Sequence, residues 1–281
     1  MSDLESAAPL AERTGLNARV TVDTSDWRLD QKLAALLRKD PKADLAPLKA
    51  VYLAHLRQRA NAFRDLSRRL LGRDVGHTLL RPVRPVGQLY AEVAARHGLR
   101  RDPDAVDRAF RRAFRASTPP GRLRYEGDGR PFWRAVVAAS LHTDSRAIFE
   151  DLYGFFGQPE AWVLREGAVE ALAELREGGV GIALVSDWDT RLRPLLTRMG
   201  LLARVDHLSV SCEVGAEKPD PAIFLDACAA LGRPPGDTLH LGDDPLRDAR
   251  GARLVGCRAW TWGEDLQDFR ELPRRFAQLR A

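Results

Sequence analysis

The sequence has few of the features that mark secreted or membrane-spanning proteins. Its 281 residues include only three cysteines, Cys212, Cys228 and Cys257, and no C-x-x-C pair. This odd, scattered set argues against a disulfide framework or a thiolate metal site and predicts buried free thiols in a reducing compartment. No apolar run approaches the roughly 18–20 residues of a membrane helix. The N-terminus carries Asp3 and Glu5 and lacks the apolar core of a signal peptide. We therefore expect a cytoplasmic protein without a membrane partner.

The chain carries an excess of positive charge that is concentrated near its N-terminus. The formal net charge is +5, and residues 1–72 contribute 13 Lys and Arg against 9 Asp and Glu, or four of those charges. Such a segment either contacts an acidic partner such as a nucleic acid or presents solvated helical faces. The arginine-rich composition of the whole chain favours solvated faces.

The stretch from Gly181 to Trp260 organises the rest of the sequence. Three short apolar runs lead into polar clusters there, amphipathic helix patterns fill the gaps between them, and a fourth run follows. Alternating strands and helices are typical of a parallel sheet covered on both faces, which binds ligands at the carboxyl ends of its strands. The runs predicted as strands are 182–185, 205–210, 238–241 and 257–262.

The polar clusters that follow these runs have a coherent chemistry. Ser186 offers a hydroxyl group, Lys218 a mobile cation, and Asp243, Asp244 and Asp248 an oxygen-rich group suited to Mg²⁺. A hydroxyl, a cation and a hard metal at one sheet edge suit a phosphoryl group, because its transfer depends mostly on positioning and charge neutralisation. Asp187 or Ser186 could instead cap the helix that follows, and Asp244 could cap a helix beginning near Pro245.

Three segments carry a resemblance to a known family. VSDWD resembles motif II of the haloacid dehalogenase-like (HAD) hydrolases, EKPDPAIF resembles their motif III, and HLGDDPLRDARGA resembles their motif IV, in the same order and with similar spacing. The resemblance covers about residues 72–265. It implies an α/β fold in which a Rossmann-like parallel sheet core carries a helical cap domain.

A fourth segment resembles motif I of the same family. It runs from Asp74 to Leu79 and matches the D-x-x-x-T-L pattern of the C1-capped subgroup. The resemblance implies that Asp74 is the nucleophile that becomes an aspartyl-phosphate and that Thr78, Ser186 and Lys218 contact the phosphoryl group. It also implies a Mg²⁺ cofactor. Its expected ligands are Asp74, the backbone carbonyl of Gly76, Asp243 and Asp248.

Motif I departs from the family pattern at one position. Family phosphatases usually carry a second Asp two residues after the first, where it protonates the leaving group and then activates water, but this chain has Gly76 there. A general acid contributes about 10²–10⁴-fold in rate. His77 is the nearest substitute.

The domain organisation follows from the positions of the motifs. Residues 71–86 and 163–281 are expected to form the HAD-like core, and residues 87–162, which read as helices, the cap that closes over the substrate. Residues 1–70 are predicted to add a basic helical N-terminal extension. We expect Tyr125, Phe132 and Trp133 to lie in the core of the cap.

These motifs predict Mg²⁺-dependent hydrolysis of small phosphomonoesters. One alternative is a HAD scaffold with impaired catalysis that acts as a binding or regulatory module, which the glycine at position 76 favours. A haloacid-type dehalogenase is the other alternative, since such relatives lack the second Asp of motif I. They also manage without Mg²⁺, and the acidic 243–248 cluster argues against that activity.

Overall fold

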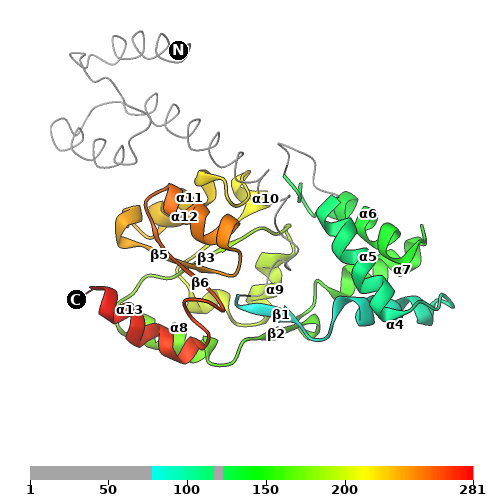
Figure 1. The fold of residues 1–281 in the computed structure, drawn as a ribbon, viewed down its shortest axis with the longest axis horizontal. Helices are drawn as coiled ribbons and strands as arrows, with labels where there is room; N and C mark the ends of the chain where they lie inside the picture. Colours follow the sequence, from blue (N-terminus) through cyan, green and yellow to red (C-terminus); the bar gives the residue numbers. More distant parts are fainter. Residues whose placement is uncertain (1–77, 117–122, 281) are drawn as a thin grey trace, which may run out of the picture.

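The computed structural model describes residues 78–116 and 123–280, in which the chain folds into an α/β part and a helical part (Figure 1). The expected extension at residues 1–70 lies outside the described residues. So do Asp74, Gly76 and His77.

Short strands pair two by two in the described residues. Parallel pairing joins β3 to β4 and β5 to β6, whereas β1 and β2 are antiparallel. The parallel strands begin and end within two residues of the predicted apolar runs, and they confirm the α/β class. The bounds are β1 Leu80–Pro82, β2 Trp162–Leu164, β3 Ala183–Ser186, β4 His207–Val210, β5 Leu239–Gly242 and β6 Arg258–Thr261.

Helices of the α/β part begin and end at residues with clear local causes. The Asp220 side chain accepts a hydrogen bond from the backbone N–H of Ala222, and Pro221 then occupies the first turn of α11. Helix α8 is followed by its C-cap residue Gly178, and the next residue, Gly179, adopts a left-handed conformation with φ 71°. The bounds are α8 Ala168–Glu177, α9 Leu192–Arg198, α10 Ser211–Val214, α11 Pro221–Ala230, a π-helical segment Pro245–Arg250, α12 Gly251–Leu254 and α13 Leu272–Arg280. Short 3₁₀ segments span Pro159–Ala161, Leu202–Arg204, Pro235–Asp237 and Phe269–Glu271.

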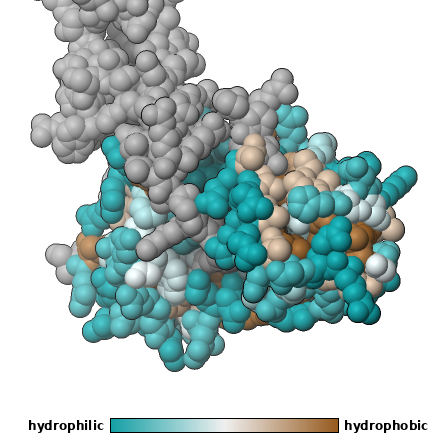
Figure 2. All heavy atoms as spheres, turned by 45° about the vertical axis from the view of Figure 1, so that its right-hand side comes forward, coloured by the Kyte–Doolittle hydropathy of each residue, from teal (hydrophilic) through white to brown (hydrophobic). Residues whose placement is uncertain are grey.

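The helical part consists of four helices around their own apolar core. Buried Tyr90, Leu141, Ile148 and Leu152 lie at its centre. Tyr125 and Phe132 are also buried, as expected, whereas Trp133 is partly exposed. Polar residues on the outer helix faces contribute to the mostly hydrophilic surface in Figure 2. The helices are α4 Val86–Arg96, α5 Pro103–Ala116, α6 Arg130–Leu141 and α7 Arg146–Phe155.

The β1–β2 ladder joins the two parts. Leu80 lies opposite Leu164 and Pro82 opposite Trp162, so the chain enters and leaves the helical part side by side (Figure 1). The ladder thereby fixes the point at which the four helices attach to the α/β part.

The cysteines are free thiols. Cys228 and Cys257 are buried with their Sγ atoms 3.8 Å apart, and Cys212 is partly exposed. Across the described residues, none of the helices combines the length and the hydrophobicity needed to cross a membrane.

Candidate active site

Most of the predicted site residues that the structure describes gather where the parallel strands end. Ser186 is the last residue of β3, and Asp243 directly follows β5. A cavity of about 760 Å³ reaches this edge, where its lining includes Thr78, Ser186, Lys218, Asp243 and Asp248. The cavity also extends through the α/β part toward the beginnings of the strands, where Gly179, Asp237 and Arg258 line it. The carboxyl ends of the strands therefore bring together the hydroxyl, ammonium and carboxylate groups that the motifs predict.

A hydrogen bond ties the end of motif I to motif IV. The Thr78 hydroxyl donates to Asp243 Oδ1 at 2.7 Å, across 165 residues of sequence. Thr78 precedes β1, while Asp243 follows β5, so this contact joins these two segments.

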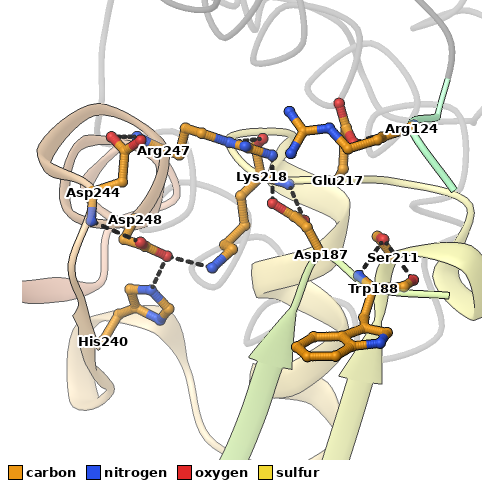
Figure 3. Close-up of polar contacts among 10 residues, drawn as sticks. All are labelled: Arg124, Asp187, Trp188, Ser211, Glu217, Lys218, His240, Asp244, Arg247 and Asp248. Carbon is orange, nitrogen blue, oxygen red and sulfur yellow. Dashed lines mark hydrogen bonds and ion pairs between the residues drawn. The ribbon is translucent and has the colours of Figure 1, made fainter. Parts of the chain in front are cut away.

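Lys218 and Asp248 form a buried ion pair. The Lys218 ammonium donates to Asp248 Oδ1 at 2.6 Å, and the two side chains are 15% and 4% exposed. His240 Nε2 lies 3.1 Å from the same oxygen, and the backbone N–H of Asp244 donates to Asp248 Oδ2 at 3.0 Å (Figure 3). Both oxygens of Asp248 are thus engaged within the protein.

The pair keeps both groups charged despite their burial. Burial acts to raise the pKa of Asp248, but Lys218 and His240 outweigh it and hold the pKa well below its usual range. For Lys218, burial acts to lower the pKa, and the nearby carboxylates of Asp248 and Asp187 outweigh it, so the pKa is raised. The ammonium group therefore stays protonated at neutral pH.

Ionisation of Asp248 should make the stability of the protein depend on pH. The pKa of Asp248 in the folded state lies below its unfolded value of about 3.9. The stability that ionised Asp248 contributes is therefore complete above about pH 3.9 and is lost as the pH falls below that value. We expect the free energy of unfolding to fall by up to about 1.4 kcal/mol per pH unit from this group. Urea unfolding between neutral and acid pH measures it. Asp248→Asn should flatten the acid slope, and Asp144→Asn, at an exposed position, should not; an unchanged slope in Asp248→Asn would contradict the assignment.

A second buried ion pair, which the sequence did not reveal, contacts the backbone of Lys218. Arg247 Nη2 donates to Asp187 Oδ2 at 2.5 Å, and the side chains are 11% and 7% exposed. Asp187 Oδ1 accepts the backbone N–H of Lys218 at 2.8 Å, and Arg247 Nε donates to the Lys218 carbonyl at 3.2 Å (Figure 3). Burial acts to lower the pKa of Arg247, but Asp187 and other carboxylates raise it overall.

Two predictions about helix caps have different outcomes. Asp244 does cap the segment that begins at Pro245, because its Oδ1 accepts the backbone N–H groups of Leu246 and Arg247. The interpretation of Asp187 as a cap is wrong, since its carboxylate is used by Lys218 and Arg247. The first turn of α9 has no side-chain cap from Ser186 either.

A complete metal site would need residues beyond those described. Within residues 78–116 and 123–280, no three His, Cys, Asp or Glu side chains are grouped so that they could hold a metal ion. Asp243 has the right chemistry for Mg²⁺ and lies at the strand ends, but Asp74 and Gly76 lie outside the described residues.

The fold and the site together define the class of protein. A parallel α/β fold with a buried lysine and several carboxylates at its strand ends is typical of enzymes that bind anionic substrates. The sequence model of the haloacid dehalogenase-like hydrolase family matches residues 30–256. This chain belongs to that family.

Individual relatives agree with this assignment. The human haloacid dehalogenase-like hydrolase domain-containing protein 3 is 37% identical over 202 residues, which cover 68% of this chain and 80% of that protein. A phosphoserine phosphatase from Thermus thermophilus is 39% identical over 106 residues, which cover 37% of this chain and 43% of that enzyme.

Solved structures support the fold. A HAD phosphatase from Thermococcus onnurineus has a TM-score of 0.51 and 21% identity, covering 72% of this chain and 94% of that one. The L-2-haloacid dehalogenase from Xanthobacter autotrophicus, solved with chloropropionic acid covalently bound, has a TM-score of 0.55 and 16% identity, covering 71% and 94%. At such identities the likeness shows the shared fold alone.

Proposed function

We propose that this protein hydrolyses small phosphomonoesters with Mg²⁺ and an aspartyl-phosphate intermediate on Asp74. The observation that carries the proposal is that Thr78, Ser186, Lys218 and Asp243 all line one cavity, in which the Thr78 hydroxyl donates to Asp243. Asp74 precedes Thr78 by four residues, a stretch of chain that spans at most about 14 Å. We propose that its carboxylate approaches Asp243.

Each residue has a distinct role in the proposed reaction. The Asp74 carboxylate attacks phosphorus, and the bond between phosphorus and the ester oxygen breaks, so that the alcohol leaves after taking up a proton. Water then hydrolyses the acyl-phosphate, which releases phosphate and restores the carboxylate. Lys218 and the Ser186 and Thr78 hydroxyl groups bind the phosphoryl oxygens, whose negative charge the ammonium offsets.

Mg²⁺ is the cofactor that this set of residues suits best. We propose the Asp74 carboxylate, the Gly76 carbonyl and Asp243 as its ligands, since Mg²⁺ prefers oxygen atoms. When bound, it would offset the negative charge of the phosphoryl group. Asp248 is the weakest of the expected ligands because both of its oxygens are engaged, and we propose that its main role is to orient Lys218.

The helical part has the position expected of a cap. Helices α4–α7 leave and rejoin the core at the β1–β2 ladder, and their side chains line the same cavity as Lys218. We propose that they form a C1-type cap that excludes water from the site.

The glycine at position 76 supports a second candidate function, that of a binding or regulatory module. Because glycine has no acid group, protonation of the leaving group falls to His77 or to solvent, and a chain that cannot compensate would act as a binding or regulatory module. A dehalogenase is less well supported, because such relatives work without Mg²⁺, whereas this chain carries Asp243, Asp244 and Asp248 after β5, where their carboxylates suit Mg²⁺.

Hydrolysis of p-nitrophenyl phosphate by the full-length protein tests the proposal. We expect turnover with Mg²⁺ and its loss when a chelator removes the metal, because the phosphoryl charge is then not neutralised. The assay is followed by p-nitrophenolate release, with a panel of other phosphate esters run alongside it. No turnover above the buffer rate across the panel would favour the binding module.

A further inference from the structure

The helical side of the cavity is lined by aliphatic and aromatic side chains. Between residues 86 and 156, every described residue that lines the cavity is aliphatic or aromatic, and none carries a charge. The polar and charged lining residues at this end lie on the α/β side, among them Lys218 and Asp243. The cavity therefore has one end suited to phosphate and one suited to an apolar group.

A chain of aromatic rings connects these two ends. Trp188 directly follows Asp187, whose carboxylate accepts the Lys218 N–H. Its ring centroid lies 4.9 Å from that of Trp162, which in turn lies 5.9 Å from Phe156. Phe156 lies 5.9 Å from Tyr90 in the core of the helical part. Aromatic rings thus extend from the residue after Asp187 into the helices, at spacings typical of favourable ring contacts.

Several polar atoms near this surface are already engaged within the protein. Asp189 is fully buried and accepts hydrogen bonds from Arg191 and from Trp133 Nε1, so the positive charge of Arg191 is neutralised. Trp162 Nε1 donates to the Phe156 carbonyl at 3.0 Å. In the described part of the chain, Trp188 Nε1 is buried without a hydrogen-bond partner.

We infer that the leaving group of the substrate is apolar, and that an aryl-bearing phosphomonoester fits the cavity better than one that carries a second charge. The inference rests on the proposed function. A carboxylate in the leaving group would lie against apolar side chains without a free cation from the described lining of the helical side, and burial of an unpaired charge is costly. A phenyl group would instead gain contact with Trp188 and Trp162.

Binding of two phosphonates that cannot be hydrolysed tests this inference separately from catalysis. Benzylphosphonate carries a phenyl ring, whereas phosphonoacetate carries a carboxylate. Isothermal titration calorimetry of the full-length protein with Mg²⁺ should give a Kd for benzylphosphonate that is about 10-fold lower or more. Equal or tighter binding of phosphonoacetate, or no binding of either compound, would overturn the inference. Preferential binding of benzylphosphonate without turnover of any ester would overturn only the phosphatase proposal.

Variants of Trp188 test whether this residue causes the preference for benzylphosphonate over phosphonoacetate. Trp188→Ala removes the first ring of this aromatic chain and should reduce the preference for benzylphosphonate about 10-fold, whereas Trp188→Phe keeps an aromatic ring and should retain most of it. Trp262→Ala is the matched control, because Trp262 stacks on Phe269 and does not line the cavity. A preference that survives in Trp188→Ala, or one lost equally in Trp262→Ala, would count against the role of Trp188. If Trp188→Ala does not fold, the comparison of the two phosphonates on the native protein still decides the inference.

Discussion

Arg247→Met should lower the free energy of unfolding by about 3–5 kcal/mol, because it leaves the Asp187 carboxylate buried without its cation. The same change should lower kcat/KM for p-nitrophenyl phosphate by about 100-fold, since small displacements of a catalytic group are costly. Asp187 and Arg247 together hold the backbone of Lys218 through its N–H and its carbonyl. Urea unfolding and steady-state kinetics measure the two effects.

A double variant separates the charge from the position. In Asp187→Asn with Arg247→Met, both charges of the pair are gone, so most of the lost stability should return, whereas the support of Lys218 stays incomplete and activity stays low. Arg193→Met is the control, because Arg193 pairs with Glu213 near the surface and should contribute less than about 1 kcal/mol. An Arg247→Met protein as stable and as active as the native one would refute the role of this pair.

The strand endings were predictable because they depend on local sequence. Apolar runs followed directly by Ser186 and Asp243 place polar groups at the edge of a parallel sheet whatever the details of packing. Lys218 differs, because α10 separates it from the end of β4. The cap at Asp244 was predictable for the same reason, since an Asp directly before a proline is a common start of a helical segment.

The partners of these groups were not predictable. Asp187 and Arg247 are 60 residues apart, and only the packing of the segment after β5 against the Lys218 loop brings them together. His240 likewise reaches Asp248 because it belongs to β5 and faces the π-helical segment. Sequence patterns specify which face a residue occupies, but not which side chain meets it there.

The aromatic lining of the cavity had a partial signal in the sequence. Tyr125 and Trp133 were expected in the core of the helical part; both line the cavity, and Tyr125 is buried. Trp188 belongs to the motif after β3, and nothing in its local sequence indicates that its ring contacts Trp162. Such a contact depends on how the helical part is attached to the core.

The central claim is that Asp74 is the nucleophile of a phosphatase. Asn keeps the shape of Asp but removes its negative charge, so it cannot attack phosphorus or bind Mg²⁺ as a carboxylate. We expect Asp74→Asn to lower the Mg²⁺-dependent rate by about 10⁴-fold or more, as removal of a nucleophile does in other enzymes. Asp144→Asn, at an exposed position on the helical part, is the matched control and should retain the native rate.

The decisive measurement is therefore hydrolysis of p-nitrophenyl phosphate with Mg²⁺ by the native protein and by Asp74→Asn in parallel. Turnover by the native protein that disappears in the variant is the predicted result, and it would make Gly76 a variation that the site tolerates. Equal turnover in both proteins would contradict the assignment of Asp74. Absence of turnover in both would contradict the assignment of p-nitrophenyl phosphatase activity and favour a binding module built on a hydrolase fold.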